Sequence, residues 1–136
     1  MTVEITVLIL ATLFHIASLT LAIICADRQI GLPKAMSPRD PERMTKPIVE
    51  QVGLRTSRLM RAVQNHLESL PLFAIACITI AITDQSTTIT QTCAWAYLGA
   101  RIIYIPSYVF GWVPWRSIFW MIGMGAITIM LFAALL

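Results

Sequence analysis

The sequence predicts an all-α integral membrane protein built as a bundle of four helices. Of its 136 residues, 57% are hydrophobic and only 12% are charged, which leaves too few polar side chains to cover a water-soluble globule. Four segments are mostly apolar over about 20 residues or more, the length at which an α-helix crosses a bilayer. These segments span residues 3–26, 57–82, 88–110 and 116–136. Only one long loop remains, so we expect residues 1–136 to form a single domain.

The first segment, 3–26, could be confused with a cleaved secretory signal. It lacks a basic start, carries Glu4, and is longer than the apolar part of a signal, which is about 7 to 15 residues. We therefore predict a retained membrane anchor. Within it, we expect His15 to hydrogen-bond to a neighbouring helix and Glu4 to be a charge at the outer boundary.

The loop, 27–56, contains four prolines and charges of both signs, which argues against a packed element of its own. The ten basic residues of the chain all fall in this loop or towards it: Arg28, Lys34, Arg39, Arg43, Lys46, Arg55, Arg58, Arg61, Arg101 and Arg116. The positive-inside rule then places the loop in the cytoplasm and both termini outside. A loop that faces lipid headgroups also accounts for the net charge of +3, so we expect no nucleic-acid partner.

The second segment, 57–82, begins with unusually polar residues, "RLMRAVQNHLESLP". Arg58, Arg61, Asn65 and Glu68 are spaced by three, four and three residues and therefore share one side of an α-helix. Glu68 lies about 16 Å along the helix from Ser57, near the middle of a hydrocarbon core about 30 Å thick. A carboxylate at that depth needs a partner, a proton or a water-filled cavity, so this polar row is a candidate site.

The third segment, 88–110, has a similar row: Tyr97, Arg101, Tyr104 and Tyr108 are spaced by four, three and four residues. Two polar rows on neighbouring helices predict one polar cleft. A structural alternative is that an ion pair between Arg101 and Glu68 staples the helices while the tyrosines form an interfacial belt. The number of donors favours a ligand-binding site, because a structural ion pair would need only one arginine and one carboxylate. In such a site, arginines can hold the carboxylates of a ligand and Glu68 can hold its ammonium. A small zwitterionic peptide such as glutathione presents these groups.

Two stretches, "RAVQNHLESLPLF" and "ARIIYIPSY", resemble the helix-two and helix-three motifs of the MAPEG family, membrane-associated proteins in eicosanoid and glutathione metabolism, in a bacterial-type form. The resemblance covers nearly the whole chain. It implies a homotrimer in a bacterial inner membrane, with glutathione bound at each subunit interface on the cytoplasmic side. The glutathione contacts that it implies are Arg58, Arg61, Asn65, Glu68, Arg101, Tyr104 and Tyr108. Where some relatives carry a tyrosine after the glutamate, this chain has Ser69.

The activity implied by the resemblance is that of a microsomal-type glutathione transferase or peroxidase in detoxification, acting on hydrophobic electrophiles or lipid hydroperoxides from the membrane. A thiol of ordinary pKa near 8.5 is only a few per cent thiolate at pH 7, and a nearby arginine or hydrogen bond lowers that pKa. The resemblance places the thiol-activating residue at Arg116 or Ser117. Glutathione is thus the expected co-substrate. We expect no metal, because Cys25, Cys77 and Cys93 lie in apolar segments without metal-ligand spacing.

Two other classes remain open. One is a non-enzymatic lipid-binding or scaffold protein of the same fold, which need not keep the predicted glutathione cluster. The other is a small proton-coupled exporter, which requires a titrating carboxylate free of tight cationic partners, whereas Glu68 shares its row with arginines. Glutathione binding followed by detection of the thiolate separates all three.

Overall fold

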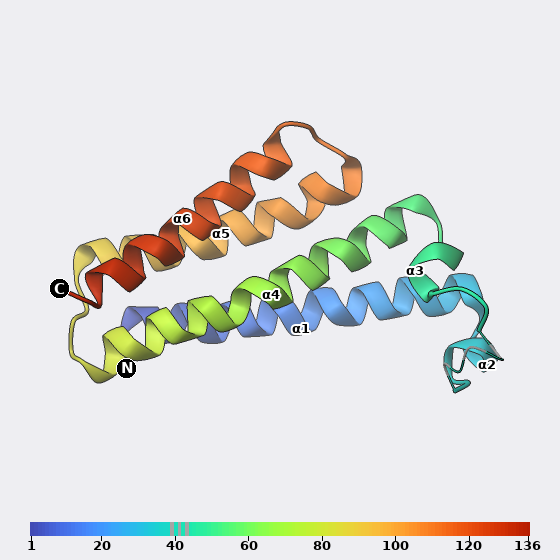
Figure 1. Ribbon diagram of the computed structural model, residues 1–136, viewed down its shortest axis with the longest axis horizontal. Coiled ribbons are helices and arrows are strands. Elements are labelled where there is room, and N and C mark those ends of the chain that lie inside the picture. The colour runs from blue at the N-terminus through green and yellow to red at the C-terminus, as the bar shows by residue number, and fades with distance from the viewer. Residues whose placement is uncertain (39, 41, 43) are drawn as a thin grey trace.

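The computed structural model describes residues 1–38, 40, 42 and 44–136 (Figure 1). Four long helices account for most of the chain: α1 (Val3–Ile30), α4 (Leu54–Ile82), α5 (Thr88–Phe110) and α6 (Trp115–Ala133). The predicted all-α class is confirmed, since the described residues contain no β-strand. Two four-residue helices, α2 (Leu32–Ala35) and α3 (Ile48–Gln51), lie in the loop, where the sequence predicted no element. The loop residues Arg39, Pro41 and Arg43 lie outside the described residues.

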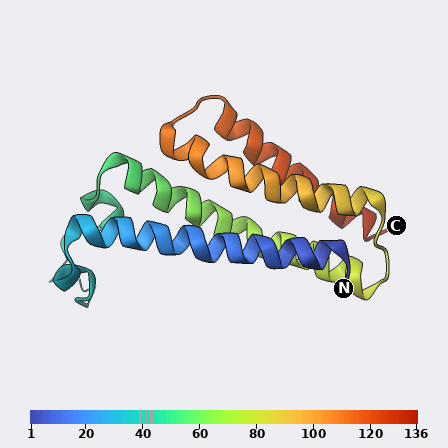
Figure 2. The same cartoon turned by 180° about the vertical axis from the view of Figure 1, so that it is seen from behind.

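The long helices form two antiparallel hairpins, α1 with α4 and α5 with α6 (Figures 1 and 2). Both termini and the connection 83–87 lie at one end of the molecule. Residues 31–38 and 44–53 and the turn between α5 and α6 lie at the other end, towards which the two hairpins diverge. The two termini therefore lie on the same side of the bundle.

Three helices, α1, α4 and α6, are long and apolar enough to cross a membrane. α5 is 23 residues long, which is sufficient length, but it is not among the helices that meet the criterion of apolar composition. Its threonines, tyrosines and Arg101 lower its mean hydropathy. The predicted set of four spans is thus supported for three of them.

The core is divided into two clusters. The larger one includes Val7, Phe73, Tyr97, Ile127 and Met130, from all four long helices, and lies towards the termini. The smaller one lies towards the loop and consists of Ala22, Leu59, Ala62, Val63, Tyr104 and Ile105. Small residues in both clusters allow helices to approach closely, as is common in membrane bundles.

Glu4 joins the two hairpins at the terminal end. It was expected as a charge at the outer boundary, but its side chain is fully buried (0% exposed). Both carboxylate oxygens accept from Ser86 Oγ at 3.0 Å, and Oε1 also accepts from Thr90 Oγ1. Ser86 immediately precedes Thr87, the N-cap of α5. The carboxylate therefore lies where a helix N-terminus favours negative charge.

Candidate functional site

The predicted row on α4 lies in the half of the helix nearest the loop. Arg61 and Glu68 are exposed, whereas Arg58 and Asn65 are partly buried. Arg61 is held by its own helix, because Nη2 donates to Ser57 Oγ at 2.8 Å and Nε donates to the Ser57 carbonyl at 3.4 Å. Glu68 lies midway between Leu54 and Ile82. The chain thus presents an anion and a cation on the uncovered side of one helix.

Arg101 of α5 connects the two polar rows. Its side chain is fully buried (0% exposed), and Nη1 donates to Asn65 Oδ1 at 3.0 Å. The guanidinium carbon lies 5.3 Å from the ring centroid of Tyr97 and 5.5 Å from that of Tyr104, within the range of cation–π attraction. Among the described residues, Arg101 makes no ion pair with the exposed Glu68. The two rows meet through an amide rather than through a stapling ion pair, and the polar cleft between them stays a prediction.

The row on α5 continues to the start of α6. The rings of Tyr104 and Tyr108 are 5.8 Å apart, and the guanidinium carbon of Arg116 lies 5.0 Å from the Tyr108 ring centroid. The Ser117 amide donates to the Pro114 carbonyl at 3.0 Å, and its hydroxyl makes no hydrogen bond to the described residues. Of the two candidates for thiol activation, Arg116 is the one seen in contact with the tyrosine row.

Arg58 points to the same turn. Gly111 ends α5 with φ +71°, and a Cβ at this position would lie 2.8 Å from Arg58 Nη1. The left-handed backbone favours glycine there, and the close approach shows that the guanidinium of Arg58 lies against this turn. The arginines Arg58 and Arg116 therefore gather with Tyr108 at the loop end of the bundle, near the predicted cytoplasmic surface.

Ser69 and two further residues support this arrangement. Ser69 is buried and its Oγ lies 2.9 Å from Tyr97 Oη, so it points inward and holds a ring that flanks Arg101. Sequence reasoning missed this role, and it also missed the role of Ser57. The spacing of four residues between Ser57 and Arg61 was a usable signal. The small residues of "GMGAIT" predict a close approach between helices, and Gly123 of this stretch packs against Arg101 from another helix.

Two histidines lie buried between α1 and α4. His15 was expected to be a satisfied hydrogen-bonding residue, but its Nδ1 has no partner among the described residues, and neither nitrogen of His66 has one. The ring of His66 contacts those of Phe14, His15 and Tyr97, at centroid distances of 5.6, 5.2 and 6.4 Å. The environment of these imidazoles is thus aromatic.

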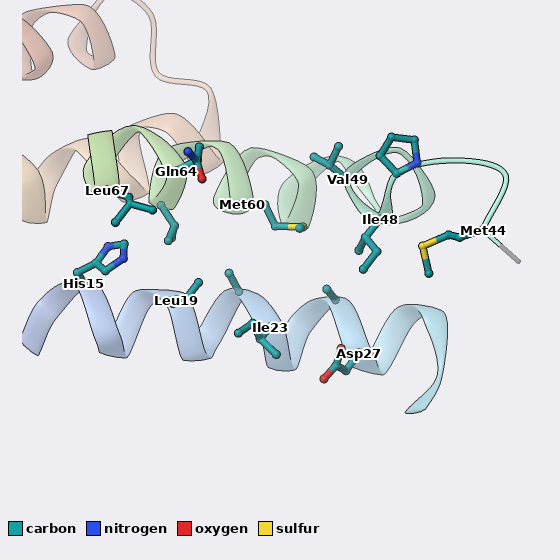
Figure 3. Close-up of a pocket in the computed structure, with 14 residues that line it drawn as sticks. His15, Leu19, Ile23, Asp27, Met44, Ile48, Val49, Met60, Gln64 and Leu67 are labelled. Carbon is teal, nitrogen blue, oxygen red and sulfur yellow. The ribbon is translucent and has the colours of Figure 1, made fainter. Parts of the chain in front are cut away.

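A pocket of about 670 Å³ lies between α1 and α4 and is closed at one end by the segment that leads into α3 (Figure 3). Its walls are mainly apolar and include Leu19, Ile23, Met60 and Leu67; His15, Asp27 and Gln64 are its polar members. In Figure 3, Met60 and Leu67 point from α4 towards α1. None of the predicted site residues lines this pocket. The polar site and the apolar pocket are therefore separate features.

The long apolar helices, one of which carries a polar row in its loop-side half, define an α-helical membrane protein. A model of the MAPEG family matches residues 3–136, and the chain belongs to this family. Comparison with curated proteins and with solved structures gives no match. The resemblance identified from the sequence is confirmed, and with three apolar helices the chain is an integral membrane protein.

Proposed function

We propose that the protein is a membrane-bound glutathione transferase or peroxidase that acts on hydrophobic electrophiles or lipid hydroperoxides. The observation that carries this proposal is the 3.0 Å hydrogen bond between Arg101 and Asn65, because it brings the polar rows of α4 and α5 together in one place. Membership of the MAPEG family supports a role in glutathione or eicosanoid metabolism. Glutathione is the thiol co-substrate in this proposal.

The accessible groups suit a peptide with charges of both signs. Arg61 offers a fork of donors to a carboxylate, and Glu68 offers acceptors to an ammonium. An acidic or basic residue at the centre of a membrane helix costs about 2.5 to 3.5 kcal/mol on insertion scales. Since Glu68 is exposed on the side of α4, a bound ammonium would compensate part of that cost. Arg58, Tyr104 and Tyr108 surround the remaining part of the ligand.

A second copy of the chain completes the site in this proposal. The side of α4 that carries Arg61 and Glu68 is not covered by the other helices, and two such groups facing lipid are unfavourable. We propose a homotrimer in which the neighbouring subunit covers this face. α5 then serves as the fourth span, with Arg101 turned inward. The loop faces the cytoplasm because the basic residues gather there, and the membrane is a bacterial inner membrane.

Arg116 stabilises the glutathione thiolate in the proposed mechanism. Its charge lowers the pKa of the bound thiol, whose proton passes to water, and the sulfur becomes the nucleophile. In conjugation, the sulfur attacks an electrophilic carbon that enters from the bilayer, and a thioether forms. The bond from this carbon to its leaving group breaks and the group departs with the electron pair, or, with an activated alkene, the π electron pair moves to the neighbouring carbon, which takes a proton from water. In peroxide reduction, the sulfur attacks the peroxide oxygen, the O–O bond breaks, and the alkoxide takes a proton to give an alcohol. A second glutathione thiol then converts the sulfenic acid into a disulfide and water.

A non-enzymatic lipid-binding or scaffold function is the second candidate. The apolar pocket between α1 and α4 favours it, because its volume and lining suit an acyl chain. Such a protein would bind lipid without lowering the pKa of a thiol. The two candidate functions therefore differ in whether the protein lowers the pKa of a bound thiol.

The deciding experiment uses the purified full-length protein in detergent. A thermal-shift screen of low-molecular-weight thiols identifies the thiol that stabilises the protein, and ultraviolet difference spectra then detect its thiolate. Turnover is followed with a hydrophobic electrophile and with a lipid hydroperoxide. We expect glutathione to bind as a thiolate. Lipid binding without any thiolate would favour the second candidate.

A further inference from the structure

We propose that Arg101 is a positioning residue that fixes the side-chain amide of Asn65, so that Asn65 offers only N–H donors to the ligand. This inference rests on the proposed function and deepens it, because it assigns the chemistry of the ligand group at Asn65. That group is an oxygen acceptor, a carboxylate or a peptide carbonyl.

The orientation of the amide follows from the chemistry of arginine. A guanidinium has donors and no acceptor, so the side-chain atom of Asn65 that lies 3.0 Å from Arg101 Nη1 must be Oδ1. The NH₂ group of Asn65 is then directed away from Arg101. No described residue accepts a hydrogen bond from it, and Asn65 is only partly buried. Its donors are therefore available beside the exposed groups of Arg61 and Glu68.

Arg101 is itself held firmly. Its guanidinium lies between the rings of Tyr97 and Tyr104, and Nη2 contacts Met124 Sδ at 3.8 Å. On the remaining side lies Gly123 of α6, where a Cβ would be 3.4 Å from Arg101 Nε. A fixed guanidinium cannot turn away to release the amide. The contacts that α6 makes with Arg101 therefore help to fix the orientation of the Asn65 amide on α4.

Packing alone does not account for an arginine at this position. The side chain is fully buried, Nε has no partner, and no carboxylate neutralises the charge among the described residues. A buried cation without an anion is destabilising, and an apolar side chain of similar volume would fill the space more favourably. An apolar side chain could not hold Asn65 Oδ1 and so could not fix the orientation of the Asn65 amide.

The order of donors and acceptors along α4 sets the specificity. Arg61 presents donors, Asn65 presents donors about 6 Å further along the helix, and Glu68 presents acceptors about 4.5 Å beyond. A suitable thiol therefore carries two oxygen acceptors and then a cationic donor in this order. A ligand with an ammonium opposite Asn65 would leave both groups unpaired and would be rejected.

The first test is Asn65→Asp, which keeps the shape and removes the donors. Arg101 gains a carboxylate partner, so we expect the ligand-free melting temperature to be unchanged or higher. Glutathione affinity should fall by roughly 10- to 100-fold, because the ligand oxygen then faces another acceptor. Gln64→Glu is the control, since it adds the same charge one residue earlier at a residue that lines the α1–α4 pocket. Affinity equal to wild type in Asn65→Asp would overturn the inference.

The second test is a double-mutant cycle between Arg101 and Asn65. Arg101→Gln should lower glutathione affinity in the wild-type background but not further in an Asn65→Leu background, because no amide remains to be fixed. If Arg101 only supported the fold, the same fold-loss would appear in both backgrounds, and the inference would be wrong. Arg101→Met takes the place of Arg101→Gln if the latter does not assemble, because methionine likewise cannot hold Asn65 Oδ1 with a strong donor. Wild-type protein that binds no glutathione would overturn the proposed function itself, and the inference with it.

Discussion

His15 and His66 pack edge to face between α1 and α4, with their ring centroids 5.2 Å apart and their planes at 80°. His66 is fully buried, and neither of its nitrogens has a partner among the described residues. An unpaired buried donor or acceptor costs about 1 to 3 kcal/mol. The unpaired nitrogens of His66 therefore lower the free energy of unfolding.

From this contact we predict that His66→Leu leaves the free energy of unfolding unchanged or raises it by up to about 2 kcal/mol. Phe73→Ala is the comparison, since Phe73 is equally buried and stacks on Tyr97 at 4.0 Å. That variant should lose about 3 to 5 kcal/mol. Thermal unfolding in detergent measures both. Equal destabilisation in the two variants would mean that the His66 nitrogens are paired in the membrane.

The exposed pair on α4 gives a second prediction. Glu68→Gln removes the charge that would hold an ammonium, and Arg61→Ala removes the fork for a carboxylate. Losing one partner of a buried charged hydrogen bond costs about 2 to 5 kcal/mol, which is roughly 30-fold to several thousand-fold in affinity. Calorimetric titration of glutathione and melting curves are measured side by side. If both variants melt early but bind glutathione as wild type does, the row is a structural staple.

A third prediction separates Arg116 from Ser117. With Arg116→Gln, the pKa of the bound glutathione thiol should rise by about 1 to 3 units, because a nearby positive charge stabilises the thiolate. The thiolate present at pH 7 then falls by about tenfold or more, and its absorbance appears only at higher pH. Ser117→Ala should leave the spectrum unchanged. The opposite pattern, with the loss in Ser117→Ala alone, would assign activation to the serine.

The buried carboxylate of Glu4 gives a fourth prediction. Glu4→Gln keeps the volume but loses acceptor capacity opposite Ser86 and Thr90, so stability should fall by about 1 to 3 kcal/mol. Asp84→Asn, an exposed acid at the same end of the molecule, should change stability by about 0.5 kcal/mol or less. Chemical denaturation of the two variants in detergent provides the comparison. Equal stabilities would show that the Glu4 contacts contribute nothing to the fold.

The subunit arrangement gives a fifth prediction. If a neighbouring subunit covers the exposed face of α4, native mass spectrometry from mild detergent should detect a trimer. Glutathione should raise the temperature at which this trimer dissociates, because it binds between the subunits. A spectrum that contains only monomer or dimer would rule out the proposed homotrimer with a site at each subunit interface.

Much of the fold could be predicted from periodicity alone. The polar rows could be identified from the sequence because residues spaced by three and four share one side of a helix. In the structure, the hydrogen bond between Arg101 and Asn65 joins the two rows. The helices α2 and α3 were missed because four residues are too few to show a period. The burial of Glu4 was missed because its hydroxyl partners are 82 and 86 residues away and have no distinctive pattern. The position of Arg116 relative to Tyr108 could not be predicted, because it depends on the geometry of the turn at Gly111 and residue spacing does not give that geometry.

The bond between Glu4 and the start of α5 also has a consequence for biosynthesis. Glu4 leaves the ribosome long before Ser86 and Thr90 are made, so the first hairpin is complete while its buried carboxylate still lacks the hydroxyls that satisfy it. Water at the membrane surface must solvate this group until the second hairpin arrives. The first hairpin therefore reaches its final packing around Glu4 only when the second hairpin supplies these hydroxyls.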